Sequence, residues 1–257
     1  MTLPPPLTDL PDLDNQLQAV GYAVLDARSL ARLSDVPCGA FEAWAGCWDD
    51  LPPDGHLRDG GRYRRRRHSC FVVAPGAGPP GARLSIVPHR AHWQPVEYNA
   101  LHGGIQRWFE PMATAMTTHT AWARLLVALA DLAARLRHAP DARWCVEAHP
   151  FRIDTTDGIG RPTPEGAHRD GVDLVAVILV SRLNIKGGET RVFDTRGPQG
   201  VRFTLGEAWS ALLLDDERVI HESTPIQPVN PSDASSHRDT LVLTFRKESF
   251  QGPADGM

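Results

Sequence analysis

Residues 174–180 read Leu-Val-Ala-Val-Ile-Leu-Val, a run without a single polar side chain. A run of this length is shorter than most helices and is typical of a β-strand that is buried on both faces. Further strand-like stretches surround it and are separated by Gly, Pro, Asp and Asn; they cover residues 146–153, 191–193, 208–214 and 241–245. The second half of the chain is therefore predicted to form a sandwich or barrel of strands.

The first half of the chain has helical patterns instead. Within residues 119–138 the apolar side chains recur at helical spacing, as Trp122, Leu125, Leu126, Leu129, Leu132 and Leu136. This spacing predicts an amphipathic helix that packs on a core. Two more helices are expected at residues 14–20 and near 29–50, with a short strand at 22–25 between them and a loop at 75–82. Helices followed by strands indicate an α+β protein.

The sequence shows no internal repeat and no clear linker, so residues 1–257 are predicted to be a single domain. We expect it to have three parts. A Pro-rich, flexible arm covers residues 1–12, a helix-rich part with supporting strands covers 13–140, and a β core covers 141–250. The sequence leaves open whether the Pro-rich N-terminus mediates a homodimer.

Composition narrows the class of protein. The net charge of −4 gives no strong attraction to nucleic acid or to an anionic membrane. The four cysteines lack C-x-x-C spacing and are expected to be free thiols in a reducing compartment. Neither a secretory signal nor an apolar stretch of the ~20 residues needed to span a bilayer is recognised. We expect a cytoplasmic protein that binds no nucleic acid and no membrane.

A basic run, Arg62-Tyr63-Arg64-Arg65-Arg66-Arg67-His68, precedes an apolar stretch. Nucleic-acid binding is the less favoured interpretation, because the run is short, contains one aromatic residue and belongs to an acidic protein. A strand with one solvated face is favoured. In such a strand, alternate arginines can also face a cleft and hold a carboxylate.

The motif with the clearest chemistry is His168-Arg169-Asp170, with His221 further along the sequence. In an extended segment residues i and i+2 point the same way, so His168 and Asp170 can grip one metal ion while Arg169 points elsewhere. Two imidazoles and one carboxylate form the facial triad of non-haem Fe(II) oxygenases. The kinase catalytic loop also contains His-Arg-Asp, but it needs an Asn where this protein has Val175, so a kinase is rejected.

Arg238-Asp239-Thr240 lies directly before the predicted strand 241–245. An arginine and a threonine two residues apart share one face of a strand and can bind a carboxylate together. Arg238 and Thr240 are thus candidates to hold the distal carboxylate of 2-oxoglutarate. Arg246 is the nearest alternative to Arg238.

Several segments together resemble the bacterial 2-oxoglutarate/Fe(II) dioxygenases that hydroxylate free L-amino acids, of the L-isoleucine 4-hydroxylase type. The resembling segments are residues 61–67, 99–111, 164–171 (PEGAHRDG), 184–190 (NIKGGET), 219–221 with 224–226, and 238–240. The sequence departs from this pattern at Glu222, where a smaller residue is expected, and in a longer loop at 230–237.

The resemblance implies an α+β fold with a double-stranded β-helix (jelly-roll, cupin-like) core and flanking N-terminal helices. It also implies Fe(II), 2-oxoglutarate as co-substrate, and O2. His168, Asp170 and His221 match the positions of the metal ligands, and Arg238 matches that of the 2-oxoglutarate anchor. The expected reaction is hydroxylation of an unactivated C–H bond on the side chain of a free L-amino acid, with release of succinate and CO2.

A free amino acid needs a cation for its carboxylate and an anion for its ammonium group. Arg152 or an arginine of residues 62–67 is a candidate for the first, and Glu165 or Glu189 for the second. The sequence does not fix which amino acid is used, aliphatic or citrulline- and arginine-like, nor which carbon is hydroxylated.

Three other functions stay open at this point. The first is a hydroxylase of a peptide or specialised-metabolite substrate. The second is a zinc or manganese barrel that uses no 2-oxoglutarate, against which Arg238 and Thr240 argue. The third is a non-catalytic, cupin-like barrel that binds metal or a small molecule, which predicts the loss of a ligand.

Overall fold

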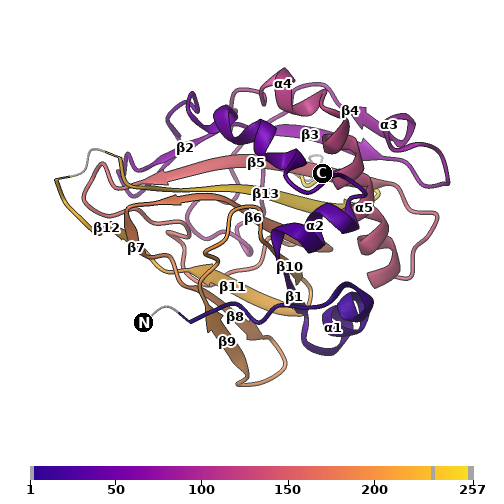
Figure 1. Ribbon diagram of the computed structural model, residues 1–257. Helices are drawn as coiled ribbons and strands as arrows, with labels where there is room; N and C mark the ends of the chain where they lie inside the picture. The colour runs from indigo at the N-terminus through magenta and orange to yellow at the C-terminus, as the bar shows by residue number, and fades with distance from the viewer. Residues whose placement is uncertain (1–2, 233–234, 254–257) are drawn as a thin grey trace.

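The computed structural model describes residues 3–232 and 235–253 (Figure 1). Its centre is a large antiparallel sheet of eight strands in the order β1-β10-β6-β13-β5-β3-β4, with β2 also pairing with β5. The strands are β1 (Tyr22–Leu25), β2 (Arg64–Arg66), β3 (Ser69–Val73), β4 (Leu84–Ile86), β5 (Trp144–Asp154), β6 (Leu174–Leu183), β10 (Ala211–Asp215) and β13 (His237–Lys247). The run 174–180 lies inside β6, near the middle of this sheet.

Two smaller sheets complete the β core, one with the order β11-β8-β9 and one that pairs β12 with β7. Their strands are β7 (Ile185–Gly187), β8 (Thr190–Asp194), β9 (Gly200–Phe203), β11 (Val219–Ser223) and β12 (Ile226–Pro228). Val175 and Leu179 of the large sheet pack in one buried cluster with Val192, Phe203 and Val219 of the small one. Antiparallel sheets that face each other in this way form the predicted jelly-roll, so the prediction of the fold is confirmed.

Helices cover the other face of the large sheet (Figure 1). They are η1 (Leu10–Asp12), α1 (Leu13–Val20), α2 (Ala27–Leu33), η2 (Ala40–Trp48), α3 (Pro80–Arg83), α4 (Thr114–Thr117) and α5 (Thr120–Leu136). The apolar stripe of α5 packs against Val146, Ala148 and Leu243 of the sheet, in the largest buried cluster of the described residues. This helical layer leaves the opposite face of the sheet free to carry polar groups.

Several elements differ from the sequence prediction, including the loop expected at 75–82, at the end of which α3 begins with Pro80. A helix was expected near residues 29–50, but α2 ends at Leu33 and a 3₁₀ helix begins only at Ala40. Pro37 and Gly39, the latter with φ of +86°, interrupt the helical path. The strand predicted at 208–214 begins at Ala211, because Trp209 has φ of +64° and leaves the extended conformation.

The N-terminal segment expected to be an arm makes hydrogen bonds with the body of the protein. The amide of Thr8 donates to the carbonyl of Val24 at 2.8 Å, and the amide of Thr204 donates to the carbonyl of Leu3 at 2.9 Å. Residues 3–8 therefore lie along β1 and the loop after β9.

β5 and β13 pair along their whole length, from Asp154 opposite His237 to Trp144 opposite Lys247. Because side chains alternate along a strand, one face of the pair is apolar and joins the helical core. The other face carries polar side chains, among them Glu147, His149, Arg238, Thr240 and Thr244, and these line a cavity. This alternation brings the chemistry of the protein to one side of the sheet.

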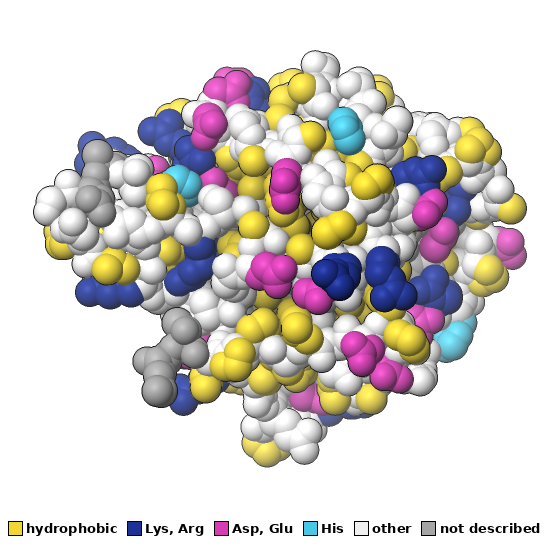
Figure 2. Space-filling view, in the orientation of Figure 1, with side chains coloured by type: hydrophobic (Ala, Val, Ile, Leu, Met, Phe, Trp, Pro, Cys, Tyr) yellow, Lys and Arg dark blue, Asp and Glu magenta, His cyan; other side chains and the backbone are white. Residues whose placement is uncertain are grey.

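The basic run 62–67 supplies β2 and forms ion pairs with acidic side chains. Arg62 pairs with Asp157, Arg64 with Asp54, Arg65 with Asp154, and Arg67 with Asp50 and Glu110. On the face in Figure 2, basic and acidic side chains are interspersed. In the described part of the protein, no helix has both the length and the apolar character that crossing a bilayer requires.

Candidate active site

The cavity opens on the face of the large sheet that is turned away from the helices, and loops close it from the sides. Most of the residues that line it are polar, among them Arg64, Arg66, His92, Gln94, Arg107, Glu147, His149, Glu165, His168, Asp170, His221, Arg238 and Thr240. Residues from β2, β5, β11, β13, the segment between β4 and α4 and the loop before β6 thus meet in one space.

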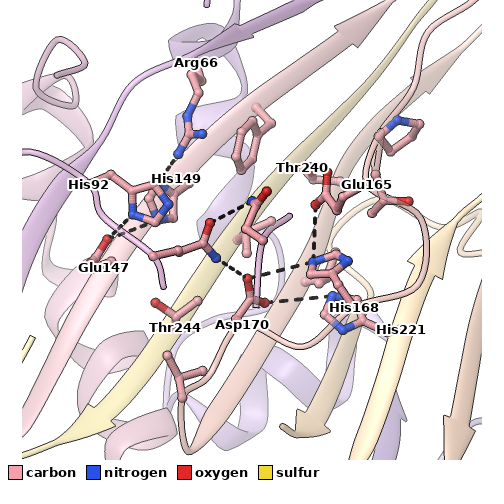
Figure 3. Close-up of a pocket in the computed structure, with 18 of the residues that line it drawn as sticks. Arg66, His92, Glu147, His149, Glu165, His168, Asp170, His221, Thr240 and Thr244 are labelled. Carbon is pink, nitrogen blue, oxygen red and sulfur yellow. Dashed lines mark hydrogen bonds and ion pairs between the residues drawn. The ribbon is translucent and has the colours of Figure 1, made fainter. Parts of the chain in front are cut away.

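His168, Asp170 and His221 come together at one end of the cavity (Figure 3). The backbones of His168 and His221 exchange two hydrogen bonds, of 3.1 and 2.9 Å, which tie the loop before β6 to β11. Nε2 of His168 lies 3.9 Å from Oδ1 of Asp170, and Nε2 of His221 lies 4.0 Å from Oδ2. Their ligand atoms all lie within 4.8 Å of one another, a geometry able to hold a metal ion. The donor set suits Fe(II).

Neighbouring groups orient His168 for this task. Its Nδ1 lies 3.0 Å from the carbonyl oxygen of Gly166, an acceptor, so Nδ1 carries the proton. The lone pair of the neutral ring is then on Nε2, the atom that faces Asp170. Metal-binding histidines are commonly held in this way by a hydrogen bond at their other ring nitrogen.

Asp216 positions the loop that carries Asp170. Its carboxylate accepts hydrogen bonds from three successive backbone amides, those of Asp170 (3.0 Å), Gly171 (2.7 Å) and Val172 (3.0 Å). Arg169 points away from the cavity and donates to the carbonyl of Glu217 at 3.1 Å. The alternation expected for His-x-Asp is therefore the one observed.

A bound cation would change the ionisation of His168, Asp170 and His221. Burial raises the pKa of the Asp170 carboxyl and, with the nearby His168, lowers the pKa of His221. Burial opposes protonation of His168 as well, but the carboxylates of Asp170 and Glu165 raise its pKa. A divalent cation at this point would favour the ionised carboxylate and the neutral imidazoles.

Gln94 links Asp170 to the other side of the cavity, and sequence reasoning missed it. Its amide nitrogen donates to Oδ1 of Asp170 at 3.0 Å. Its carbonyl oxygen accepts from Asn99 at 3.0 Å and from Arg107 at 2.9 Å. With both of its partners fixed, the orientation of this buried amide is determined, and it holds one carboxylate oxygen of Asp170 in place.

Arg238 is buried, with 3% of its surface exposed, and lies on the cavity face of β13 beside Thr240. Among the described residues no carboxylate pairs with it, and its Nε and Nη2 are buried without a hydrogen-bond partner. Its neighbour Asp239 is bound instead by Arg152, through two contacts of 2.8 Å. Burial and the nearby Arg182 lower the pKa of Arg238 to about 10. A buried guanidinium without an anion fits a carboxylate ligand.

The alternative anchor, Arg246, has a different environment. Although it borders the cavity, its Nη1 donates to the carbonyl oxygen of Ser249 at 2.8 Å and contacts the hydroxyl at 2.5 Å, on the exposed side. Its donors are therefore partly satisfied and solvated, whereas those of Arg238 are not.

The three residues suggested for the substrate are in different places. Glu165 lines the cavity, with Oε1 at 3.5 Å from Nε2 of His168. Arg152 points to the other side of β5, where it pairs with Asp239. Glu189 pairs with Arg191 at 3.0 Å. Because neither Arg152 nor Glu189 reaches the cavity, we do not carry them forward as substrate-binding residues.

Three other buried arginines line the cavity, namely Arg64, Arg66 and Arg107. Arg66 lies between the rings of Phe109 and Phe151, with its guanidinium carbon 4.0 and 4.2 Å from their centroids. Its Nη2 donates to Nδ1 of His149 at 2.6 Å. Since arginines of the run 62–67 were candidates for a carboxylate, Arg64 and Arg66 are the members of that run that face the cavity.

His92, Glu147 and His149 lie at the far end of the cavity from His168 (Figure 3). With the buried His68 they form a second group of titratable side chains. The sequence analysis did not single it out. A signal was present in residues 145–149, Cys-Val-Glu-Ala-His, where polar side chains occupy alternate positions of an otherwise apolar strand. Such alternation places Glu147 and His149 on the face opposite the core.

The comparison with known families now gives the class of the protein. Residues 45–244 match the model of the 2OG-Fe dioxygenase family, so the protein belongs to that family. Enzymes of this family require Fe(II), 2-oxoglutarate and O2. This match does not specify a free amino acid as the substrate.

Solved structures of similar proteins agree with the family. A bsmA homolog from Methylobium petroleophilum PM1 is 53% identical, with a TM-score of 0.88 over 96% of this protein and 97% of that one. IDO from Bacillus thuringiensis is 13% identical, with a TM-score of 0.73 over 94% of this protein and 97% of that one. TqaL, an Fe(II)/(alpha)ketoglutarate-dependent dioxygenase, is 18% identical, with a TM-score of 0.67 over 95% and 89%. The last two show a shared fold. Among curated proteins, none matches this sequence.

Proposed function

We propose that this enzyme hydroxylates an unactivated C–H bond on the side chain of a free L-amino acid. In the balanced reaction the substrate, 2-oxoglutarate and O2 give the hydroxylated amino acid, succinate and CO2. His168, Asp170 and His221 would hold Fe(II), and Arg238 with Thr240 would hold the distal carboxylate of 2-oxoglutarate. The bound metal supplies the activation of O2, which protein groups alone do not provide.

The observation that carries this proposal is the presence of two separate buried cationic regions in one cavity. Arg238 is one of them and suits the co-substrate. Arg64, Arg66 and Arg107 form the other, from strand β2 and the segment between β4 and α4. Because a residue inside a peptide has no free α-carboxylate, a second arginine region favours a substrate that carries a carboxylate of its own.

The side chains of the enzyme have distinct tasks in this scheme. Gln94 and Asp216 keep Asp170 in position, and the hydrogen bond to Gly166 keeps His168 in position. Phe109 and Phe151 hold the plane of Arg66. The enclosing loops exclude water from the reacting carbon. Together these groups fix the geometry on which the choice of carbon depends.

A peptide or specialised-metabolite hydroxylase is the runner-up. The non-catalytic barrel is less favoured, because all three candidate ligands lie within reach of one another. The cytoplasmic location stays a prediction of the sequence, and the question of a homodimer stays open.

Succinate formation by purified protein with Fe(II), 2-oxoglutarate and ascorbate, screened against each free L-amino acid, tests the proposal. We expect turnover above background with one or a few of them, and none with the corresponding amino-acid amide, which lacks the carboxylate. Asp170→Ala should abolish substrate-dependent succinate formation while leaving the circular dichroism spectrum unchanged. The exposed Asp9→Ala serves as the control.

Each outcome separates the alternatives. Turnover with peptides but with no free amino acid would favour the runner-up. Full activity of Asp170→Ala would contradict the ligand assignment, and a protein that binds 2-oxoglutarate but never forms succinate would favour a non-catalytic barrel.

A further inference from the structure

Glu147 is a buried carboxylate that the scheme above does not use. It is 6% exposed and lines the cavity. Three imidazole rings surround its Oε2, with Nε2 of His68 at 3.1 Å, Nδ1 of His92 at 2.5 Å and Nε2 of His149 at 3.7 Å. All of these contacts go to Oε2. Within the described residues, Oε1 accepts no hydrogen bond.

The hydrogen bond from Arg66 determines which nitrogen of the His149 ring carries the proton. A guanidinium can only donate, so Nδ1 of His149, 2.6 Å from Nη2 of Arg66, must accept. The proton of the neutral His149 ring is then on Nε2 and faces Glu147. Burial opposes ionisation of Glu147, but His92 and His68 hold its pKa well below the usual range. The carboxylate is therefore an anion before any ligand arrives.

The same four side chains are close enough to hold a metal ion. Coordination by Nε2 of His149 would need a lone pair on that atom and a proton on Nδ1, where it would face the donor of Arg66. The positive charge of Arg66 also opposes a second cation bound to this ring. An organic ammonium group avoids the first obstacle, because it donates hydrogen bonds to the carboxylate and needs no lone pair from imidazole. In a zwitterion, the carboxylate also offsets the charge of Arg66.

We propose that Oε1 of Glu147 receives the α-ammonium group of the substrate, and that Arg66 receives its α-carboxylate. This inference rests on the proposed function and makes it more specific. His149 lies between the two charged groups and contacts both. Phe109 and Phe151 hold Arg66 by its two faces, so a planar carboxylate can approach only along the edge of the guanidinium.

The charges in the cavity agree with a zwitterion. Arg64 is neutralised by Asp54 at 2.7 Å, and Arg238 and Asp170 are assigned to the co-substrate and the metal. Arg66 and Arg107 then remain as buried cations, and Glu147 and Glu165 as anions, so the remaining charges of the lining balance, apart from the solvated Arg246. Within this set, Arg66 and Glu147 are the cation and the anion that are separated by a neutral ring. A ligand with both charges leaves neither of these residues uncompensated, whereas a ligand with only one does. The site should thus bind the 2-hydroxy or des-amino analogue more weakly than the substrate itself.

The test uses the complete protein loaded with Fe(II) and 2-oxoglutarate without oxygen, so that binding is measured without turnover. The probes share one apolar group: L-leucine, 4-methylpentanoate, which lacks the ammonium group, and 3-methylbutylammonium, which lacks the carboxylate. Calorimetry gives their affinities for wild type, Glu147→Gln and, as matched control, the exposed Glu207→Gln. Circular dichroism and Fe(II)–2-oxoglutarate absorbance report on the fold and on the iron site.

We expect Glu147→Gln to weaken the binding of L-leucine and of 3-methylbutylammonium by about 10- to 100-fold, because a buried charged partner is lost. Binding of 4-methylpentanoate should not weaken, and Glu207→Gln should match wild type. Glu147→Asp, which keeps the charge, should restore part of the affinity and replaces Glu147→Gln if that variant does not fold. Equal affinity of wild type and Glu147→Gln for the ammonium probe, or no binding of it by wild type, would overturn the inference.

Two further results separate this inference from the proposed function. Glu147-dependent binding of the ammonium probe, in an enzyme that turns over no amino acid, would support the inference and reject the proposed function. If Glu147→Gln turns over an amino acid with the KM of wild type for that amino acid, the proposed function is supported and the inference is rejected. A second equivalent of zinc in the purified protein that disappears in Glu147→Gln would make the group a metal centre and also overturn the inference.

Discussion

Gln94 donates its side-chain amide to Oδ1 of Asp170 across 3.0 Å, although the two residues are far apart in sequence. The carbonyl oxygen of the same amide accepts from Arg107, which is itself buried. The candidate metal ligand is therefore connected through one amide to the region that we assign to the substrate. This connection leads to the first prediction.

Replacing Gln94 with Ala should weaken Fe(II) binding by about 10-fold to 100-fold, the usual effect of removing a group that orients a metal ligand. Asp170 would lose a donor and Arg107 an acceptor. The measurement is the Fe(II) concentration that gives half-maximal succinate formation. Gln199→Ala, at an exposed position, is the control. An unchanged Fe(II) requirement would mean that Asp216 alone fixes Asp170.

Arg238→Ala should raise the KM for 2-oxoglutarate by about 100-fold or more, because a buried ionic partner of the carboxylate is removed. The KM for the amino acid should change far less, since its charges are assigned to other residues. Arg202→Ala, at an exposed site, controls for loss of charge. If the KM for 2-oxoglutarate does not change in Arg238→Ala but rises in Arg246→Ala, the anchor is Arg246.

Gly187→Ala should destabilise the fold by roughly 2 kcal/mol or more, because an alanine there would be strained and would clash. Gly187 has φ of +80°, and a Cβ at this position would lie 2.1 Å from the carbonyl oxygen of Pro225. Urea unfolding measures the loss. Gly197→Ala is the matched control, since its Cβ would meet nothing within 4 Å. Equal stability of the two variants would show that β7 and β12 can separate at little cost.

The apoprotein should lose stability as the pH falls from about 6.5 towards 3, in part through His92. Burial lowers the pKa of His92 to about 3, so the native ring stays neutral where the unfolded ring takes up a proton. The unfolded state then binds more protons, which favours it as the pH falls. Each such histidine contributes about 1.4 kcal/mol per pH unit within this window.

Urea unfolding of metal-free protein at pH 7, 6 and 5 checks this sign. In His92→Gln the free energy of unfolding should fall less steeply between pH 6 and 5, by the equivalent of about one proton. His138→Asn, an exposed position with φ of +49° that asparagine tolerates, should keep the wild-type slope. A His92→Gln slope equal to that of wild type would mean that the native ring is already protonated at pH 5.

The sequence predicted the strands better where they are apolar than where they carry function. β6 was recognised because both of its faces are buried. The strand expected at 241–245 begins four residues earlier, at His237. The apolar pattern missed these first residues because they are polar: Arg238 and Thr240 face the cavity, and Asp239 pairs with Arg152. Periodicity in hydrophobicity reports burial in a core, so a strand that lines a polar cavity is detected only in part.

The site was predictable to a similar degree. The His-x-Asp spacing indicated that His168 and Asp170 point the same way, and the structure places them beside His221, while their role as iron ligands stays a prediction. Gln94 and Arg107 could not be anticipated, because they lie in an irregular segment between β4 and α4, where no period constrains the direction of a residue. Their positions depend on tertiary contacts alone.

β13 has strands on both sides along nearly its whole length and presents Leu241, Leu243 and Phe245 to the core and Arg238, Thr240 and Thr244 to the cavity. A shift of one residue would exchange these two sets. Insertions or deletions in β13 would therefore displace its core residues as well as alter the proposed co-substrate site. The irregular segment between β4 and α4 follows no such alternation. A library that seeks new substrates should therefore vary that segment, except for Gln94, which holds Asp170, and the core residue Met112, and should leave β13 intact.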